Sequence, residues 1–298
     1  MKAMLLTLLL WVGLAPAWAV VQIQPRIIGG TLTEDNAWPS VVAIRMEVKN
    51  ERGRLLERRC VGTLVAPRWV MSAAHCFFPE SGLAVEPDAR GDNTTVFIDR
   101  ARISSAVLDP EMGLPVTQIY IHPYFTSGSG YYDSDIALVE LAYPVEGVPT
   151  QPLGRDPEAG EIATVVGWGV TEVGLDGQPK TTATLADELH EADLPIVSTE
   201  VCRSVMGAGN ISDNMICAGY QEGGVDSCLG DSGGPLLILQ DGEYRQVGIV
   251  SFGDGCAKPD RYGAYTRVTA YADWISELTE LKVDGGAPRV ATADTETR

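Results

Sequence analysis

The sequence has few of the residues that indicate metal or nucleic-acid binding. Among 298 residues there are three histidines and six cysteines, and no two cysteines have the Cys-x-x-Cys spacing typical of zinc sites. Lysine and arginine number 22 against 40 acidic residues, which gives a net charge of −18. Such a surface repels phosphate, although it attracts cations and favours solubility. We therefore expect no metal, no cofactor and no nucleic-acid partner.

Long apolar runs are also scarce, and the one that exists lies at the N-terminus. Lys2 precedes the apolar run Met4–Val12, and the small-residue site Ala17–Ala19 follows. This order is typical of a secretory signal peptide, here residues 1–19. An uncleaved membrane anchor is the alternative, which Pro16 and the cleavage site disfavour. We expect no stable membrane span and a secreted protein, which would be extracellular, or periplasmic in a bacterium.

Cysteine in an exported chain indicates disulfides rather than free thiols. The six cysteines allow 15 different pairings, and spacing alone does not choose among them.

Short β-rich runs separated by turn residues dominate the chain after residue 26. These runs are Val41–Val48, Val61–Val65, Val96–Ile98, Ile136–Leu141, Thr164–Gly167, Pro235–Leu239 and Gln246–Phe252. Few stretches before residue 268 have a helical period, so the pattern predicts an all-β sandwich or barrel. The acidic, alanine-rich stretch Thr182–Asp193 is ambiguous, because its propensity also suits a helix.

The end of the chain has a different pattern. Val268, Tyr271, Ile275 and Leu278 recur every three or four residues, which predicts an amphipathic helix packed on a core. Residues 283–298 are polar and without period, and we expect this tail to be disordered.

The strongest chemical signal is the run Gly230–Pro235, which contains Ser232 between glycines. Serine is a weak nucleophile that needs a base, and neighbouring glycines let backbone N–H groups face a reacting carbonyl oxygen. Among the histidines, His190 lies in a charged run and is expected at the surface, and His122 is expected to be structural. His75 remains as the base, and Asp135, at the start of an apolar strand, is a carboxylate that could orient it.

Together these segments resemble the trypsin-like serine endopeptidases with the chymotrypsin fold. The resemblance covers Arg26 to about Lys282. It rests on the segments Arg26–Gly30, Ala73–Cys76, Asp135–Leu138, Gly167–Gly169, Cys217–Gly219, Asp226–Pro235, Val250–Gly253 and Gly263–Val268. It implies two antiparallel six-stranded β-barrels with a C-terminal α-helix, in a protease domain over residues 27–282. The first barrel would span about 27–144 and the second about 145–282.

The resemblance also implies catalytic roles. His75 would be the general base, Asp135 would orient it and Ser232 would attack the substrate, while the N–H groups of Gly230 and Ser232 would form the oxyanion hole. Ser251 would support the aspartate. The implied disulfides are Cys60–Cys76, Cys202–Cys217 and Cys228–Cys256.

Substrate preference is implied by the same comparison. Asp226 matches the floor of the primary pocket in trypsin, next to Ser227, and Gly253 and Gly263 match walls that leave room for a long side chain. The implied partners are protein or peptide substrates with arginine or lysine before the cut, because a buried carboxylate selects a cation. A chymotrypsin-like or elastase-like preference is the alternative that Asp226 disfavours.

Activation is implied as well. The resemblance makes residues 20–26 an activation propeptide, removed by cleavage after Arg26. The new ammonium group of Ile27 would then pair with Asp231. An activating protease and protein inhibitors are further expected partners, and we expect a monomer.

Some positions depart from the family pattern. Phe252 replaces the usual tryptophan beside the pocket, and Tyr262 stands where trypsin has proline, which in this family permits a sodium site. The segment 77–118 is longer than in trypsin, so calcium ligands cannot be carried over. A catalytically inert homologue that acts as a binding protein is the alternative from another class. It usually lacks a triad residue, whereas all three are present here.

A basic cluster and two glycosylation motifs complete the candidates. The cluster Lys49, Arg52, Arg54, Arg58 and Arg59 could bind an acidic partner or form a solvated hairpin. The tripeptides beginning at Asn93 and Asn210 are glycosylation acceptors only if the host glycosylates.

Overall fold

The computed structural model describes residues 27–49, 55–77, 93–98, 113–128, 131–170, 172–174, 176–180 and 185–284. The predicted signal peptide, the residues 20–26 and all but the first two residues of the predicted tail lie outside this set, and so do Arg52 and Arg54. Among the described residues, no helix is both long and apolar enough to cross a bilayer.

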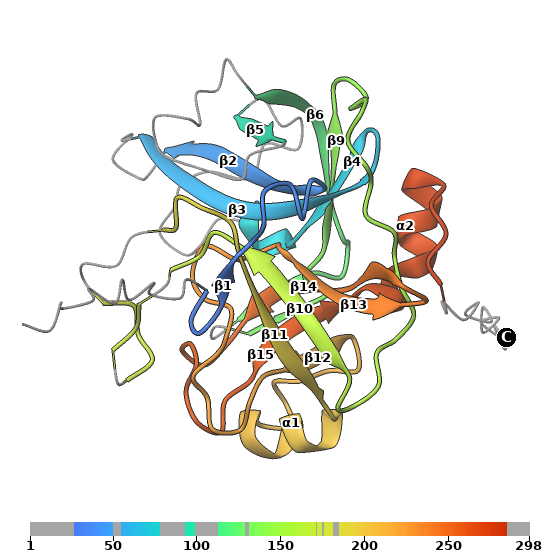
Figure 1. Cartoon of the computed structure of the whole chain (residues 1–298). Coiled ribbons are helices and arrows are strands. Elements are labelled where there is room, and N and C mark those ends of the chain that lie inside the picture. Colours follow the sequence, from blue (N-terminus) through green and yellow to red (C-terminus); the bar gives the residue numbers. More distant parts are fainter. Residues whose placement is uncertain are drawn as a thin grey trace, which may run out of the picture.

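Two closed β-barrels form the molecule, one above the other in Figure 1. The first barrel joins its strands in the order β2 (Val41–Lys49), β3 (Leu55–Ala66), β4 (Trp69–Ser72), β9 (Ala137–Leu141), β6 (Leu114–Ile121) and β5 (Thr94–Phe97). Strand β5 pairs with β2 and closes the ring, and all of the pairings are antiparallel. The predicted strand runs of the first half therefore belong to one barrel.

The second barrel closes in the same way. Its ring is β10 (Ile162–Gly167), β13 (Pro235–Gln240), β14 (Glu243–Phe252), β15 (Gly263–Arg267), β12 (Met215–Ala218) and β11 (His190–Val197), and β1 (Thr31–Leu32) pairs with β11 from outside. The all-β prediction of two antiparallel six-stranded barrels is confirmed. Strands β7 (Thr126–Gly128) and β8 (Tyr131–Asp133) form a separate hairpin.

The last four residues of the ambiguous acidic stretch belong to strand β11, and its residues 185–189 form no helix. The residues of β11 alternate between buried and more exposed, with Ala192, Leu194 and Ile196 in the core of the second barrel. Only a strand gives this period of two, so burial decides against the local helical propensity. The same alternation points His190 inward, where it is 1% exposed and its Nδ1 lies 2.6 Å from the carbonyl oxygen of Glu188. The prediction of a surface position for His190 is wrong.

Two helices accompany the barrels. The predicted C-terminal helix begins as a 3-10 turn at Val268–Tyr271 and continues as α2 (Ala272–Thr279). It follows the last strand of the second barrel, yet Val268 and Ile275 are buried in the core of the first, as the position of α2 in Figure 1 suggests. Helix α1 (Thr199–Met206) was not predicted from periodicity, because its eight residues bury only Cys202 and Met206.

A third cluster of apolar side chains joins the barrels. Val41, Val61 and Phe97 of the first barrel pack with Val166 and Leu237 of the second. The barrels therefore meet through an apolar interface, and loops at its edge bring together residues that are far apart in the sequence.

Candidate active site

His75 and Asp135 form a hydrogen-bonded pair at the edge of the first barrel. The Nδ1 of His75 lies 2.7 Å from the Oδ2 of Asp135, and the backbone N–H of His75 donates to Oδ1 over 2.8 Å. His75 belongs to a short 3-10 helix, Ala74–Cys76, which the Cys60–Cys76 disulfide attaches to β3. Asp135 lies two residues before the start of β9, in a buried run. Backbone and ring are thus both bonded to one carboxylate, which fixes the imidazole.

The second barrel also holds Asp135. The hydroxyl of Ser251, on β14, donates to Oδ2 over 2.5 Å, and the hydroxyl of Thr266, on β15, donates to the backbone carbonyl of Asp135 over 2.8 Å. The aspartate is 1% exposed. Its two oxygens accept three hydrogen bonds, so this buried carboxylate is well satisfied.

Ser232 lies on a loop between the barrels that glycines shape. The carbonyl of Ser232 accepts a 2.8 Å hydrogen bond from the N–H of Val61, and Gly233 donates to the carbonyl of Val250 over 2.9 Å. Gly233 has φ +83°, and a Cβ there would lie 2.3 Å from the carbonyl oxygen of Val61. Only glycine permits this approach, so the loop is held between one strand of each barrel.

Two backbone N–H groups on this loop donate no hydrogen bond to the described part of the protein. Gly230 has φ +98°, and within the described part of the chain neither its N–H nor that of Ser232 donates a hydrogen bond to a protein group. Likewise, no hydrogen bond within this part joins the imidazole Nε2 of His75 to the hydroxyl of Ser232. Catalytic hydrogen bonds of this kind often form only when substrate is bound.

Asp231 is fully buried beneath the same loop. Its carboxylate accepts hydrogen bonds from the N–H of Gly169 over 2.7 Å and from the N–H of Cys228 over 2.9 Å. Burial raises its pKa to about 6. Ile27 is also fully buried and lies in the core of the second barrel. In the uncut chain it has an amide nitrogen rather than an ammonium group, so no cation of its own is available to Asp231.

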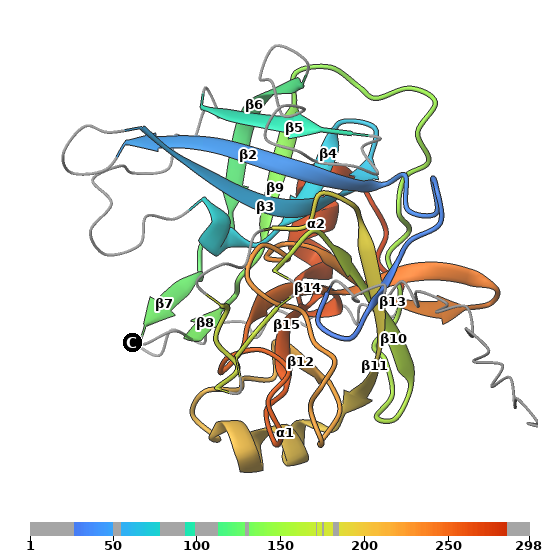
Figure 2. The ribbon, with the colours of Figure 1, turned by 60° about the vertical axis from the view of Figure 1, so that its left-hand side comes forward.

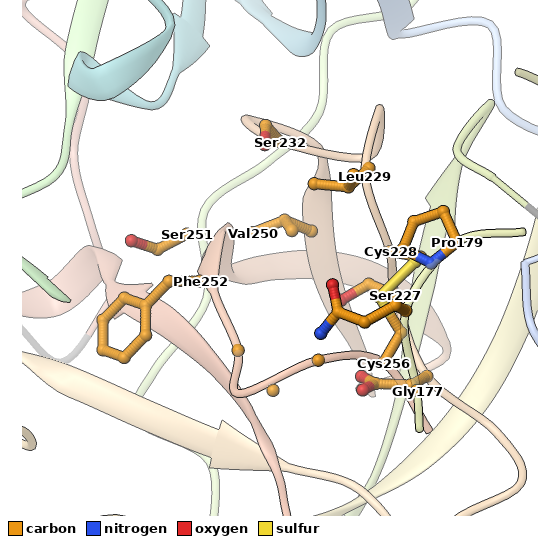
Figure 3. Close-up of a pocket in the computed structure, with 15 residues that line it drawn as sticks. Gly177, Pro179, Ser227, Cys228, Leu229, Ser232, Val250, Ser251, Phe252 and Cys256 are labelled. Carbon is orange, nitrogen blue, oxygen red and sulfur yellow. A yellow bond between two sulfur atoms is a disulfide. The ribbon is translucent and has the colours of Figure 1, made fainter. Parts of the chain in front are cut away.

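A cavity of about 260 Å³ opens beside Ser232. Figure 3 shows Ser232 and Leu229 toward one end and Ser227, Cys256 and Gly177 toward the other. Every residue that was expected to bind substrate lines it, namely Asp226, Ser227, Ser251, Phe252, Gly253 and Gly263. The structure therefore brings the serine and the candidate specificity residues into one space.

Asp226 has an unsatisfied carboxylate in this cavity. It is 5% exposed; its Oδ2 accepts from the N–H of Ala257 over 2.9 Å, and its Oδ1 has no hydrogen-bond partner among the described residues. Burial, the largest cause, raises the pKa of Asp226 to about 7. A Cβ on Gly263 would lie 3.1 Å from Oδ1. A side chain at residue 263 would therefore occupy the space next to this oxygen.

One side of the cavity was missed from the sequence. Gly177, Gln178 and Pro179 also line it, and the carbonyl of Gly177 accepts a 2.9 Å hydrogen bond from the N–H of Cys256. A Cβ on Gly177 would come within 2.5 Å of the Lys258 side chain. These contacts are long-range, and the only local signal is the turn residue glycine.

All six cysteines are paired. The disulfides are Cys60–Cys76, Cys202–Cys217 and Cys228–Cys256, which is the pairing that the family resemblance implies. Cys60, His75 and Cys76 have their potential metal-ligating atoms within 4.8 Å of one another. Because both sulfurs belong to one disulfide, they are not thiolates, and this cluster does not have the chemistry of a metal site.

Most of the other candidate residues lie elsewhere. His122 packs edge-on against Tyr271 and Trp274. Arg59 of the basic cluster is paired with Glu57 over 2.5 Å, and the side chain of Lys49 lies outside the described residues. Asn210 donates to the carbonyl of Met206 over 2.7 Å. Of the basic cluster, Arg58 alone among the described side chains reaches the candidate site, where its guanidinium donates to the carbonyl of His75 over 3.4 Å.

The two barrels are those of the trypsin-like serine protease family, which has the chymotrypsin fold. A model of the trypsin family matches residues 27–275, and the chain belongs to the trypsin family. It is 36% identical over 271 residues to a human protein named serine protease 56, a match that covers 87% of this chain and 39% of the human protein. The mouse protein of the same name is 36% identical over 262 residues, which cover 85% of this chain and 38% of the relative. The chain thus spans about two fifths of the length of these relatives.

Proposed function

We propose that this protein is a secreted serine endopeptidase that hydrolyses peptide bonds after arginine or lysine. The observation that carries the proposal is the buried, unpaired Oδ1 of Asp226 in the cavity that also contains Ser232. A buried carboxylate without a counter-ion is costly. An arginine or lysine side chain that entered the cavity would supply the missing charge and hydrogen bonds, so substrate selection follows from charge pairing.

In the proposed reaction His75 acts as the general base. The Nε2 of His75 takes the proton of the Ser232 hydroxyl while Oγ forms a bond to the substrate carbonyl carbon. The carbonyl oxygen becomes an oxyanion, which the N–H groups of Gly230 and Ser232 stabilise. The carbon–nitrogen bond then breaks, and the imidazolium gives its proton to the leaving amine. A water molecule repeats the sequence on the acyl-enzyme and releases the acid.

Asp135 serves this cycle through its geometry. Because its oxygens bind both the backbone and the Nδ1 of His75, the ring keeps the tautomer with Nε2 free to accept a proton. The carboxylate also stabilises the imidazolium that forms when Ser232 is deprotonated.

Activation by cleavage between Arg26 and Ile27 is part of the proposal. The new Ile27 ammonium would pair with Asp231, whose burial otherwise raises its pKa to about 6. A neighbouring cation favours the carboxylate, so pairing would stabilise the loop that holds Gly230 and Ser232. An activating protease of trypsin-like preference would recognise Arg26, and the enzyme itself could do so.

The cellular setting is proposed from composition and disulfides. Three disulfides and the N-terminal leader support export to an oxidising compartment, extracellular or, in a bacterium, periplasmic. Membership of the trypsin family supports protein or peptide substrates, and the same site would accept a side chain from the reactive loop of a protein inhibitor. We propose a monomer.

A panel of fluorogenic peptides that differ only in the residue before the cut tests this proposal. The substrates carry Arg, Lys, Phe, Leu or Ala at that position, and the activated protein is compared with its Ser232→Ala variant. Cleavage of the Arg and Lys peptides alone, abolished in the variant, is the expected result. An activated protein that cleaves none of the peptides would support the inert homologue instead, and a preference for Phe or Leu would contradict the role of Asp226.

Maturation has its own test. N-terminal sequencing of active material is expected to begin at Ile27, and Arg26→Gln should block processing by trypsin-like enzymes. Full activity in the uncut chain would exclude activation by this cleavage.

A further inference from the structure

A tyrosine ring lies flat against the imidazole of His75. The ring centroids of Tyr132 and His75 are 4.9 Å apart and the planes differ by 9°, which is a stacked arrangement. Tyr132 is the central residue of β8, three residues before Asp135, so one short segment contributes contacts to both the face and the Nδ1 edge of the imidazole. The stacked tyrosine ring restricts rotation of the imidazole away from the orientation in which its Nδ1 faces Asp135.

The hairpin that carries this tyrosine is attached to the other barrel. The Oδ1 of Asp133 accepts hydrogen bonds from the N–H of Ser134 over 2.8 Å, from the hydroxyl of Ser212 over 2.9 Å and from the amide of Asn214 over 3.3 Å. Ser212 and Asn214 lie between α1 and β12, in the second barrel. Figure 2 shows β7 and β8 projecting from the first barrel toward the end of the molecule that holds α1.

Backbone conformation and ring packing reinforce this attachment. Ser134, between Asp133 and Asp135, has φ +53°, which is unfavourable for a residue other than glycine and is compensated here by its hydrogen bond to Asp133. The rings of Tyr131 and Tyr132 contact Phe252 edge-on, with centroids 5.4 and 6.2 Å apart. The position of Tyr132 is therefore set by contacts on several sides rather than by the hairpin alone.

We propose that Tyr132 is a positioning residue for His75 and that Asp133 fixes Tyr132 in place. The inference rests on the proposed function, because it assigns a role in the proton transfer by His75. The tyrosine ring keeps the imidazole against Asp135 and shields one of its faces from water. When Ser232 is deprotonated the imidazole becomes a cation, and an aromatic face stabilises a cation held over it. The ring thus contributes to the transition state and not only to the resting geometry.

A comparison of a short and a longer substrate distinguishes positioning of His75 by Tyr132 from direct contact between Tyr132 and the substrate. A single-residue substrate such as benzoyl-arginine p-nitroanilide has no peptide residues before the arginine, whereas a tetrapeptide anilide does. For Tyr132→Leu we expect kcat to fall about 10- to 100-fold on both substrates with KM nearly unchanged, since a displacement of about 1 Å costs about 100-fold. Tyr132→Phe keeps the ring and should retain kcat within about twofold.

The matched control is Tyr124→Leu, the same substitution on an exposed tyrosine that lies against His122. It should leave both substrates unaffected. The proton on the Nδ1 of His75 gives a second readout: its NMR signal should be sharp in the wild type and in Tyr132→Phe, and broadened by exchange with water in Tyr132→Leu. If Tyr132→Leu does not fold, Asp133→Ala, which leaves the ring itself intact, should give the same loss of kcat and the same broadening.

Three results would decide the matter otherwise. A loss confined to the tetrapeptide and expressed in KM would make Tyr132 a substrate contact and overturn the inference. Unchanged kcat and an unchanged NMR signal in Tyr132→Leu would also overturn it. An activated wild type that hydrolyses neither substrate would overturn the proposed function itself, irrespective of Tyr132.

Discussion

The candidate site contains two buried aspartates, one from each barrel, and their surroundings differ. Asp135 has both oxygens bonded, to His75 and to Ser251. Asp226 is also buried, yet one of its oxygens has no partner among the described residues. The protein itself satisfies the first carboxylate, and we propose that a cationic substrate side chain satisfies the second. In this proposal, Asp135, His75 and Ser232 are organised in advance for proton transfer, and the cavity at Asp226 is completed only when a substrate binds.

The largest expected effect comes from removing Ser232 or His75, the groups proposed to carry out proton transfer and nucleophilic attack. Ser232→Ala and His75→Ala should each lower kcat/KM for an arginine peptide by three orders of magnitude or more, and the double variant should be scarcely worse. Residues that act as one unit are strongly non-additive. Steady-state kinetics on the activated protein measures this, and substantial turnover by Ser232→Ala would end the assignment of the nucleophile.

Removing the Asp226 carboxylate should change substrate selectivity more than the rate of catalysis. Removing one partner of a buried ion pair costs about 3–5 kcal/mol, so Asp226→Ser should lower kcat/KM for arginine substrates by about two to four orders of magnitude. Activity toward Phe or Leu substrates should fall far less or rise, because His75 and Ser232 are untouched. A variant that still prefers arginine would show that the cation binds elsewhere.

The affinity of the Asp226 cavity for a cation should also depend on pH. Burial raises the pKa of Asp226 to about 7 when the cavity is empty, and a bound cation favours the carboxylate, so binding releases a proton below that pH. The affinity for benzamidine, a flat cation, should therefore rise about tenfold per pH unit up to about 7 and then level off. Calorimetry on the Ser232→Ala variant measures this. Asp226→Ser should bind weakly with no such slope, and a flat profile with Asp226 present would contradict the shift.

The smallest expected effect is the difference between arginine and lysine substrates, which reports how the substrate cation pairs with Asp226. Arginine should be preferred to lysine modestly, because its planar guanidinium can pair with a carboxylate in two places. Matched Arg and Lys peptides measure the ratio, and a strong preference for lysine would indicate that one donor alone reaches Asp226.

Sequence reasoning located the candidate residues where the signal is local, and their catalytic roles stay predictions. Gly230–Pro235 and the residues around His75 were found as short motifs, and the barrels followed from strand periodicity and the family resemblance. It failed where long-range packing determines the position of a residue. Strand alternation buries His190 despite its charged neighbours, and helix α1 is too short to show a period. The wall at Gly177 and the stacking of Tyr132 depend on contacts across the fold that no local pattern encodes.

The interleaving of the two barrels at the site has a consequence for how the protein is made. His75 and Asp135 are 60 residues apart in sequence, and Asp135 and Ser251 are 116 apart. Contacts of such separation form late in folding, since closing long loops is slow. A chain emerging from the ribosome cannot bring nucleophile and base together until β14 has been synthesised and has docked. If the protein is the protease proposed above, incomplete chains would lack proteolytic activity, independently of any propeptide.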